Sequence, residues 1–241
     1  KVFSAIFRGA GAYHHYIPAL VRQIPAREEF VTSYTPYQAE CSQGVLQSIF
    51  EFQTMMCELT GLDVANASVY DGASAAAEAV AMCRERKRLS VLASASSHPM
   101  VLSTIDTYCH AVGVEMRVVP VREGITDADA LAAMSEELGD SFSCFYVQQP
   151  NYLGLIEDAR KLGEIVHARG AKFVMGINPV AAALLETPAE CGADIAVGDT
   201  QPFGMPLSFG GPYLGFMTAT DAMMRKLPGR IVGQTTDVDG R

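Results

Sequence analysis

The sequence has few positive charges, and it contains no long apolar run. Its 18 Lys and Arg residues are outnumbered by 27 Asp and Glu residues, which gives a formal net charge of −9 at pH 7. A protein that binds nucleic acid needs a basic face, so this balance argues against a nucleic-acid partner. No apolar run reaches the ~18 residues of a membrane span, and no signal peptide opens the chain. We therefore expect neither nucleic acid nor a membrane among its partners.

The six cysteines do not have the spacing of a metal site or of a redox motif. The sequence contains no C-x-x-C pair, and no His lies at metal-ligand spacing from a Cys. Most of the cysteines lie in apolar stretches, where cysteine behaves as a small buried hydrophobe. The pattern predicts a reduced, cytoplasmic protein without a metal.

Apolar strands alternate with helices along most of the chain. The predicted strands are 64–70, 90–95, 114–121, 142–148, 171–177, 193–198 and 213–219. A helix is predicted from 39 to 59, with Gly61 as its stop, and four more helices end near residues 87, 111, 138 and 170. Strands that are apolar throughout and separated by helices predict a mostly parallel sheet covered on both faces, which is a three-layer α/β fold.

The chain divides into three segments. We expect an irregular N-terminal interface segment at 1–38, a large α/β domain at 39–225, and the start of a connection to a further small domain at 226–241. The first residue, Lys1, is not an initiator Met, and the last residues, "GRIVGQTTDVDGR", contain no closing helix. We therefore expect the chain to be a piece of a longer one.

Ligands of such folds bind at the carboxyl ends of the strands. After the first strand comes "YDGASAAAEA", in which Asp71-Gly72 makes a turn and Ser74 can cap a helix. The free amides of this helix start either hold a phosphate or belong to an ordinary turn and cap. The segment contains neither a Walker motif nor G-x-G-x-x-G.

The later strand ends carry polar side chains but few reactive ones. His98, at the head of a helix, either stacks on a flat ligand or is simply a polar residue at a helix start. Gln148 and Gln149 can point into a cleft, and Asn178 follows the next strand. The last loop, "DTQPFGMPLSFGGPYLGF", has the composition of a ligand loop, but it contains no Lys, His, Cys or carboxylate after Asp199.

Together these loops resemble the large domain of the pyridoxal-phosphate (PLP)-dependent transferases of the aspartate-aminotransferase fold (fold type I). The stretch "YTPYQAECSQGVLQSIFEFQTMMCELTGLDVANASVYDGASAAAEA" is similar to the P-protein family of the glycine cleavage system, and within it to the first subunit of the two-subunit bacterial form. The likeness continues in "GAGAYHHYIPA", "QQPNYLGLIED", "QPFGMPLSFGGPYLGF" and "LPGRIVGQTTDVDG". It covers essentially all of the chain, and the family subunit extends beyond both ends.

The resemblance implies that this chain has lost the catalytic groups of its own site. The Schiff-base lysine position of the family falls on Gln201, and the preceding His position falls on Thr200. A Gln side chain cannot form an aldimine, because its nitrogen is an amide. The acid that faces the pyridine nitrogen falls on Gly176, or on Asn178 in a register shifted by two, and neither can hold the pyridinium protonated. We expect no catalytic residue here and no tightly bound cofactor, but a vestigial cofactor set of Gly72, Ala73, Ser74, His98, Gly176, Asn178 and Gln201.

The resemblance further implies a role as a non-catalytic partner subunit. The PLP-bearing subunit 2 of the P-protein removes CO2 from glycine and transfers the aminomethyl group to the lipoyl group of the H-protein, within a heterotetramer. This chain would complete the pocket of that subunit. The residues expected to do so are His14, His15, Tyr34, Thr35, Tyr37, Gln38 and Glu40. The segment "SYTPYQAE" gathers phenols, a hydroxyl, an amide and a carboxylate beside a rigid proline, which suits the orientation of a polar substrate.

The same residues are also compatible with different roles. Thr35 and Glu40 can serve as local caps, and the tyrosines can serve as packing. The whole chain can instead be an independent PLP-dependent transferase or lyase that uses another lysine. It can also be a pure scaffold whose loops never reach the active site of a partner.

Overall fold

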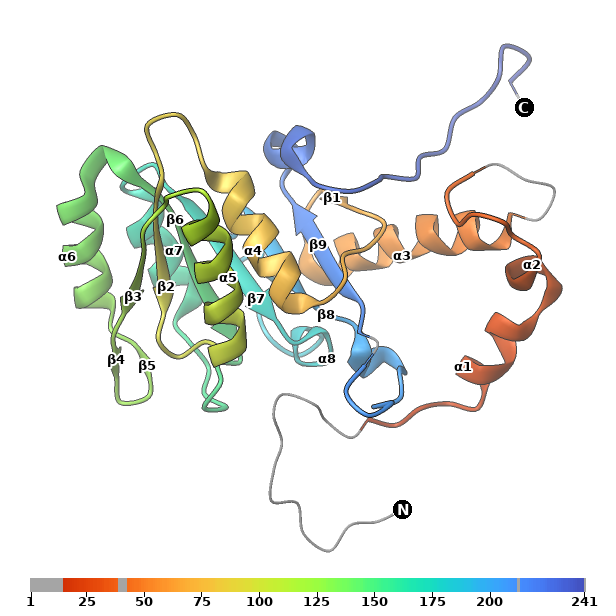
Figure 1. The fold of residues 1–241 in the computed structure, drawn as a ribbon, viewed down its shortest axis with the longest axis horizontal. Coiled ribbons are helices and arrows are strands. Elements are labelled where there is room, and N and C mark those ends of the chain that lie inside the picture. Colours follow the sequence, from red (N-terminus) through yellow and green to blue (C-terminus); the bar gives the residue numbers. More distant parts are fainter. Residues whose placement is uncertain (1–14, 39–42, 212, 241) are drawn as a thin grey trace, which may run out of the picture.

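The computed structural model describes residues 15–38, 43–211 and 213–240. Within these residues, seven strands form one sheet in the order β1-β9-β8-β7-β6-β2-β3 (Figure 1). They are β1 (Val64–Ala65), β2 (Ser90–Ser94), β3 (Met116–Val119), β6 (Phe142–Gln149), β7 (Lys172–Ile177), β8 (Ile195–Asp199) and β9 (Gly215–Ala219). Five neighbouring strands, β8, β7, β6, β2 and β3, pair in parallel. Strand β9 runs antiparallel to both β8 and β1. The predicted mostly parallel sheet is confirmed.

Helices cover both faces of this sheet. The helices of the described residues are α1 (Leu20–Gln23), α2 (Glu28–Val31), α3 (Gly44–Thr60), α4 (Gly72–Cys83), α5 (Pro99–Ala111), α6 (Ala128–Leu138), α7 (Ala159–His167) and α8 (Pro179–Ala182). Short 3-10 helices lie at η1 (Ile24–Ala26), η2 (Gly139–Ser141), η3 (Gln201–Phe203) and η4 (Asp221–Lys226). Buried residues of α4 and α5 form one core cluster with the sheet, and buried residues of α3, α6 and α7 belong to the other. The three layers expected from the sequence are therefore present.

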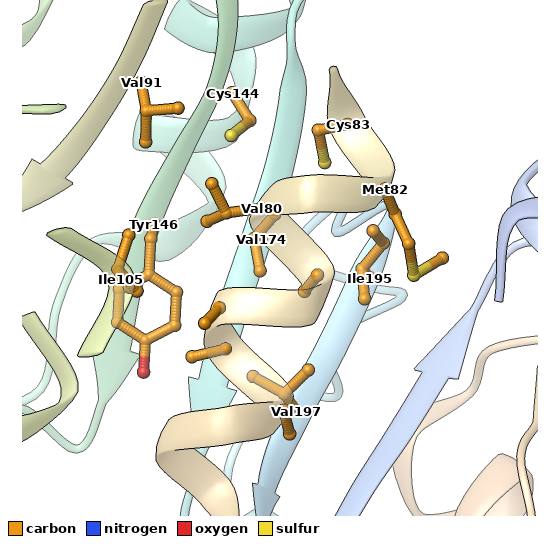
Figure 2. Packing of buried hydrophobic residues seen from close by; sticks show 14 of the residues in the cluster. Val80, Met82, Cys83, Val91, Ile105, Cys144, Tyr146, Val174, Ile195 and Val197 are labelled. Carbon is orange, nitrogen blue, oxygen red and sulfur yellow. The ribbon is translucent and has the colours of Figure 1, made fainter. Parts of the chain in front are cut away.

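The two cores follow from the alternation of side chains along each strand. On β6, Cys144 and Tyr146 point to the core under α4, and Phe145 and Val147 point to the opposite core. Figure 2 shows the α4 side, where Val80 lies against the same face of the sheet. Because both faces are buried, the central strands are mostly apolar on both faces, and most of their polar residues lie at the strand ends, as in Gln148 and Gln149 of β6.

The expected strand at 64–70 and the expected helix end at residue 87 are only partly correct. The first strand stops at Ala65, and beyond it Val69 makes a single bridge to Gly215. Helix α4 ends at Cys83, since Arg84 is extended. Residues 84–88 form a separate turn, held by two backbone hydrogen bonds between Glu85 and Arg88. The stop at Gly61 is confirmed, because this glycine adopts a left-handed conformation with φ of 71°.

A small hairpin was not expected from the sequence. Strands β4 (Val121–Arg122) and β5 (Ile125–Thr126) pair in antiparallel fashion outside the main sheet. Residues 15–38 form only short helices, and residues 227–240 form no helix or strand. The proposed division at 38 and 225 stays a prediction.

In the part of the chain that the structure describes, none of the helices is long and apolar enough to span a membrane. The same residues contain no group of three or more His, Cys, Asp or Glu side chains that could hold a metal ion.

Candidate functional site

A cavity of about 400 Å³ lies where the carboxyl ends of β6, β7 and β8 meet the starts of α4 and α5. We call it the strand-end cavity. Among its lining residues are all seven of the predicted vestigial cofactor set: Gly72, Ala73, Ser74, His98, Gly176, Asn178 and Gln201. The structure thus brings these residues together, while their role in binding stays a prediction. Four other lining residues matter below, namely Asp71, Tyr146, Gln148 and Asp199.

Helix α4 begins at the edge of this cavity. Its N-cap is Asp71, whose Oδ1 accepts a hydrogen bond from the backbone N of Ser74 at 2.7 Å, so the expectation that Ser74 caps the helix is wrong. A carboxylate is a stronger cap acceptor than a hydroxyl beside the positive end of the helix dipole. Gly72 lies against the end of β8, because a β-carbon there would come within 3.1 Å of the carbonyl carbon of Gly198.

Asp199 bridges the end of β8 and the start of α4. Its Oδ2 accepts a hydrogen bond from the backbone N of Gly72 at 3.3 Å, and its Oδ1 accepts one from the backbone N of Gln201 at 2.8 Å. Burial raises the pKa of Asp199, and the nearby Asp71 carboxylate raises it further against the lowering by the backbone hydrogen bonds. Two of the amides that could hold an external anion here, those of Gly72 and Ser74, are therefore held by carboxylates of the chain itself.

Gln201, at the predicted lysine position, is buried in its own loop. Its Nε2 donates a hydrogen bond to the carbonyl O of Met205 at 2.8 Å. The neighbouring Thr200 donates from Oγ1 to the carbonyl O of Leu214, also at 2.8 Å. The two side chains thus hold the loop closed and offer no nucleophile to the cavity.

Gly176, at the predicted position of the acid, has no room for a side chain. Gly176 pairs with Gln148 across the β6–β7 ladder, and Tyr146 lies two residues earlier on the same face of β6. A β-carbon at 176 would collide with Oη of Tyr146. The tyrosine therefore fills the space that a carboxylate side chain from β7 would occupy.

His98 is both a helix cap and a wall of the cavity, so neither role expected from the sequence is excluded. It is the N-cap of α5, and its Nδ1 accepts a hydrogen bond from the backbone N of Met100 at 3.1 Å. Its ring also lines the cavity and lies edge-on to Tyr152, with the ring centroids 4.9 Å apart. Burial lowers the pKa of His98. A neutral imidazole that is fixed as a cap can contact a ligand without adding positive charge.

The two glutamines at the end of β6 have different surroundings. Gln148 lines the cavity, and its Oε1 accepts a hydrogen bond from the backbone N of His98 at 2.8 Å. Gln149 instead accepts from the backbone N of Glu157 at 2.8 Å. The buried carboxylate of Glu157 in turn accepts from Ser96 Oγ, Asn151 Nδ2 and the backbone N of Thr126. This second network holds the 149–157 loop in place and does not face the cavity.

The predicted N-terminal residues lie apart from the strand-end cavity, and none of those described lines it. Tyr34 is 90 % exposed and Gln38 is exposed, while His15 and Thr35 are half-buried. Tyr37 lies under the guanidinium of Arg230, which is 4.2 Å from the ring centroid. His14 and Glu40 lie outside the described residues. The role of this set toward a partner stays a prediction.

Sequence reasoning did not assign Tyr146 or Asp199 to the site. A glycine within an apolar strand signals that something approaches its backbone closely, but it does not show which neighbour does so. The sequence does give some indication of Asp199 as a site residue, since it is the last ionisable side chain before a loop rich in glycine and proline.

The residues of this cavity do not fit PLP. Among the residues that the structure describes, no lysine lines the cavity to form a Schiff base. The position of the acid for a pyridine nitrogen is Gly176, whose side-chain space holds Tyr146. Asp71 and Asp199 accept two of the first amides of α4, those of Ser74 and Gly72, which a phosphate would otherwise use. No chemical step can be derived through this cofactor in this chain.

The comparisons with known proteins agree on one family. Residues 1–241 match the family model described as Glycine cleavage system P-protein. The chain is similar to a protein of Desulforamulus reducens named "Probable glycine dehydrogenase (decarboxylating) subunit 1", with 52 % identity over 236 residues that cover 98 % of this chain and 52 % of the relative. A protein of the same name from Geobacillus thermodenitrificans is 50 % identical over the same shares of both chains.

Solved structures give the same result. A crystal structure of glycine decarboxylase (P-protein) of the glycine cleavage system, in inhibitor-bound form, matches with a TM-score of 0.89 and 45 % identity, over 97 % of this chain and 52 % of that one. An apo cysteine desulfurase from Thermococcus onnurineus NA1 matches with a TM-score of 0.61 over 84 % of this chain and 51 % of its own, and at 14 % identity this likeness concerns the fold alone.

The chain spans about half the length of the relatives that it matches. The predicted fold, the large domain of the fold type I PLP-dependent enzymes, is confirmed by these structural neighbours. Because the family model and the relatives cover the chain almost from end to end, this chain belongs to the glycine cleavage system P-protein family.

Proposed function

We propose that this chain is part of the non-catalytic subunit 1 of a glycine decarboxylase. A second subunit of the same enzyme would carry PLP, remove CO2 from glycine and pass the aminomethyl group to the lipoyl group of an H-protein. Relatives at 50–52 % identity bear the name glycine dehydrogenase (decarboxylating) subunit 1, which supports a partner within the enzyme. The proposal includes a cytoplasmic location for the complex.

One observation carries the assignment of a non-catalytic role. At the position predicted for the Schiff-base lysine, Gln201 is buried and its amide is bound to the carbonyl O of Met205. An amide nitrogen does not attack an aldehyde, because its lone pair is delocalised. The decarboxylation chemistry would therefore need a lysine from another chain.

The surface of the chain supports a partner. Large apolar side chains are exposed in the N-terminal stretch and in the loop after β8, namely Tyr16, Leu20, Ile24, Val31, Tyr34, Tyr37, Phe203 and Phe209. Burying such side chains gains about 25 cal/mol for each Å² of apolar surface removed from water. A neighbouring subunit would supply the cover, and polar groups such as Thr35 would then face its pocket.

The experiment uses the full-length subunit and its full-length partner. Glycine–bicarbonate exchange and PLP content are measured for each subunit alone and for the mixture. The proposal expects no exchange and no PLP in this subunit alone, and exchange in the mixture. Activity or stoichiometric PLP in this subunit alone would instead support an independent PLP-dependent transferase or lyase.

A second comparison separates a subunit that completes the active site from a pure scaffold. Tyr34→Phe and Thr35→Ala are each introduced into the full-length subunit, with Tyr108→Phe as the control at an exposed phenol on α5, outside both the predicted set and the surface described above. The proposal expects slower turnover of the mixture for the first two variants and no change for the control. A scaffold predicts unchanged turnover for all three, with complex formation intact.

A further inference from the structure

The described residues that line the strand-end cavity include the carboxylates of Asp71 and Asp199 and no Lys or Arg. The cavity is therefore lined by negative charge. His98 also lines it, and burial lowers the pKa of its imidazole below the ordinary value, so the ring adds no compensating positive charge at pH 7. A bound anion would meet Coulomb repulsion in this cavity, and a bound cation would meet attraction.

The start of α4 is already occupied by acceptors of the chain. The first amides of a helix have no partner within the helix, which makes them a natural phosphate site. Here the backbone N of Gly72 donates to Asp199 Oδ2 at 3.3 Å, and the backbone N of Ser74 donates to Asp71 Oδ1 at 2.7 Å. An incoming phosphate would have to displace two carboxylates and would also be repelled by them.

An independent observation points to a ligand in the same cavity. Tyr146 lines it and is only 2 % exposed, and in the part of the chain that the structure describes its hydroxyl makes no hydrogen bond. Figure 2 shows this hydroxyl pointing along the strands toward their carboxyl ends, where the cavity lies. The hydroxyl is not among the fully enclosed polar atoms that lack a partner, so it opens onto the cavity that Tyr146 lines. A ligand with a polar atom at this depth would give it a hydrogen-bond partner.

We propose that the strand-end cavity binds a small, flat organic cation that carries no phosphate. Its ammonium or amidinium N–H groups would donate to the carboxylates of Asp71 and Asp199, and a polar ring atom would pair with Tyr146 Oη. The volume of about 400 Å³ suits a ligand with a single ring. The inference does not depend on the partner subunit, because every group that it uses belongs to this chain.

The test compares two probes that differ only in a phosphate, pyridoxamine and pyridoxamine 5′-phosphate. Binding of each to the isolated full-length subunit is measured by calorimetry at neutral pH and physiological salt. We expect pyridoxamine to bind at least about tenfold more tightly, since the phosphate is repelled by the two carboxylates. Equal or tighter binding of the phosphate compound overturns the proposal, and so does the absence of binding of pyridoxamine at millimolar concentration.

Single substitutions identify which side chains bind pyridoxamine and which side chains disfavour the phosphate compound. Asp199→Asn frees the Gly72 amide and removes one charge, so we expect it to shift the preference toward the phosphate compound by about tenfold or more. Tyr146→Phe is expected to weaken pyridoxamine binding about two- to tenfold and leave the preference unchanged. Asp140→Asn, at an exposed position outside the cavity, is the matched control and is expected to change neither.

The melting temperature of the Asp199→Asn variant shows whether it is folded. If the folded variant prefers pyridoxamine over pyridoxamine 5′-phosphate as strongly as the wild type does, the Asp199 carboxylate is not the cause of that preference. The wild-type comparison of the two probes needs no variant and decides the proposal even if a variant fails to fold. A failure of subunit reconstitution would not affect either result, so the proposed function and this inference are tested separately.

Discussion

The hydroxyl of Tyr146 occupies the volume that a side chain at Gly176 would need. The two residues lie on neighbouring strands and on the same face of the sheet, at the end where the cavity opens. In this fold an acid from the second of these strands is expected to face a cofactor nitrogen. A side chain at position 176 would therefore require Tyr146 to move.

The first prediction concerns this contact. Gly176→Ala is expected to lower the free energy of unfolding by about 1–3 kcal/mol, because a methyl group there overpacks the cavity wall. Urea denaturation of the full-length subunit measures the loss. The matched control is Gly233→Ala, where a β-carbon meets no atom within 4 Å and the loss is expected to stay below about 0.5 kcal/mol. Equal losses in the two variants would show that Tyr146 does not restrict position 176.

A second prediction concerns the buried carboxylate of Glu157. Its Oε1 accepts from Ser96 Oγ at 2.7 Å and from Asn151 Nδ2 at 2.8 Å, and its Oε2 accepts from the backbone N of Thr126 at 2.8 Å. Glu157→Gln places an NH2 group against one of these donors, whichever oxygen is replaced. We expect a loss of about 2 kcal/mol in the free energy of unfolding.

The control for this substitution is Glu58→Gln, because Glu58 is an exposed residue on α3. Its effect on stability is expected to be within about 0.5 kcal/mol. A Glu157→Gln protein as stable as the control would mean that the network does not hold the 149–157 loop.

The third prediction is a dependence of stability on pH. Burial raises the pKa of Cys109 and of Cys191 from 9.0 to about 11. In the unfolded chain both thiols ionise near 9.0, whereas the folded chain keeps them neutral until about pH 11. The unfolded state therefore binds fewer protons in this window, and the free energy of unfolding falls as the pH rises from 9 to 11.

The measurement compares the wild type with a Cys109→Ala, Cys191→Ala double variant. Lysines and tyrosines titrate in both proteins, so their effects cancel in the difference. We expect the difference in the free energy of unfolding to be constant below pH 8, and the wild type to lose stability relative to the variant between pH 9 and 11. A difference that does not change with pH would show that these thiols are not buried in the folded protein.

The sequence predicts the layers of the fold and the position of the cavity better than it predicts the side-chain contacts within the cavity. The central strands are mostly apolar on both faces, so a sheet covered on both faces follows from them, and their carboxyl ends meet at one edge. The sequence did not predict that Asp199 would reach the amide of Gly72, or that Tyr146 would fill the space over Gly176. Both contacts join residues on different elements, and their geometry depends on how those elements pack.

Hydrogen bonds to distant parts of the chain explain why the predicted ends of the first strand and of helix α4 were misplaced. Residues 66–69 were expected to continue a strand, but the backbone N of Ala67 instead donates to the carbonyl O of Arg230, and the chain pairs with β9 again at Val69 and Gly215. The helix that was expected to end near residue 87 stops at Cys83, and Arg88 Nη1 donates to the carbonyl O atoms of Phe142 and Arg169. These partners are distant in sequence, and a periodic pattern along the chain does not contain them.

The central claim is that the chain supplies no Schiff-base lysine to the enzyme. The full-length subunit and its partner are mixed with PLP and reduced with borohydride, and the pyridoxyl-lysine is located by mass spectrometry. We predict the label on a lysine of the partner subunit and on none in this chain. A label on Lys87, Lys161, Lys172 or Lys226 of this chain would contradict the account.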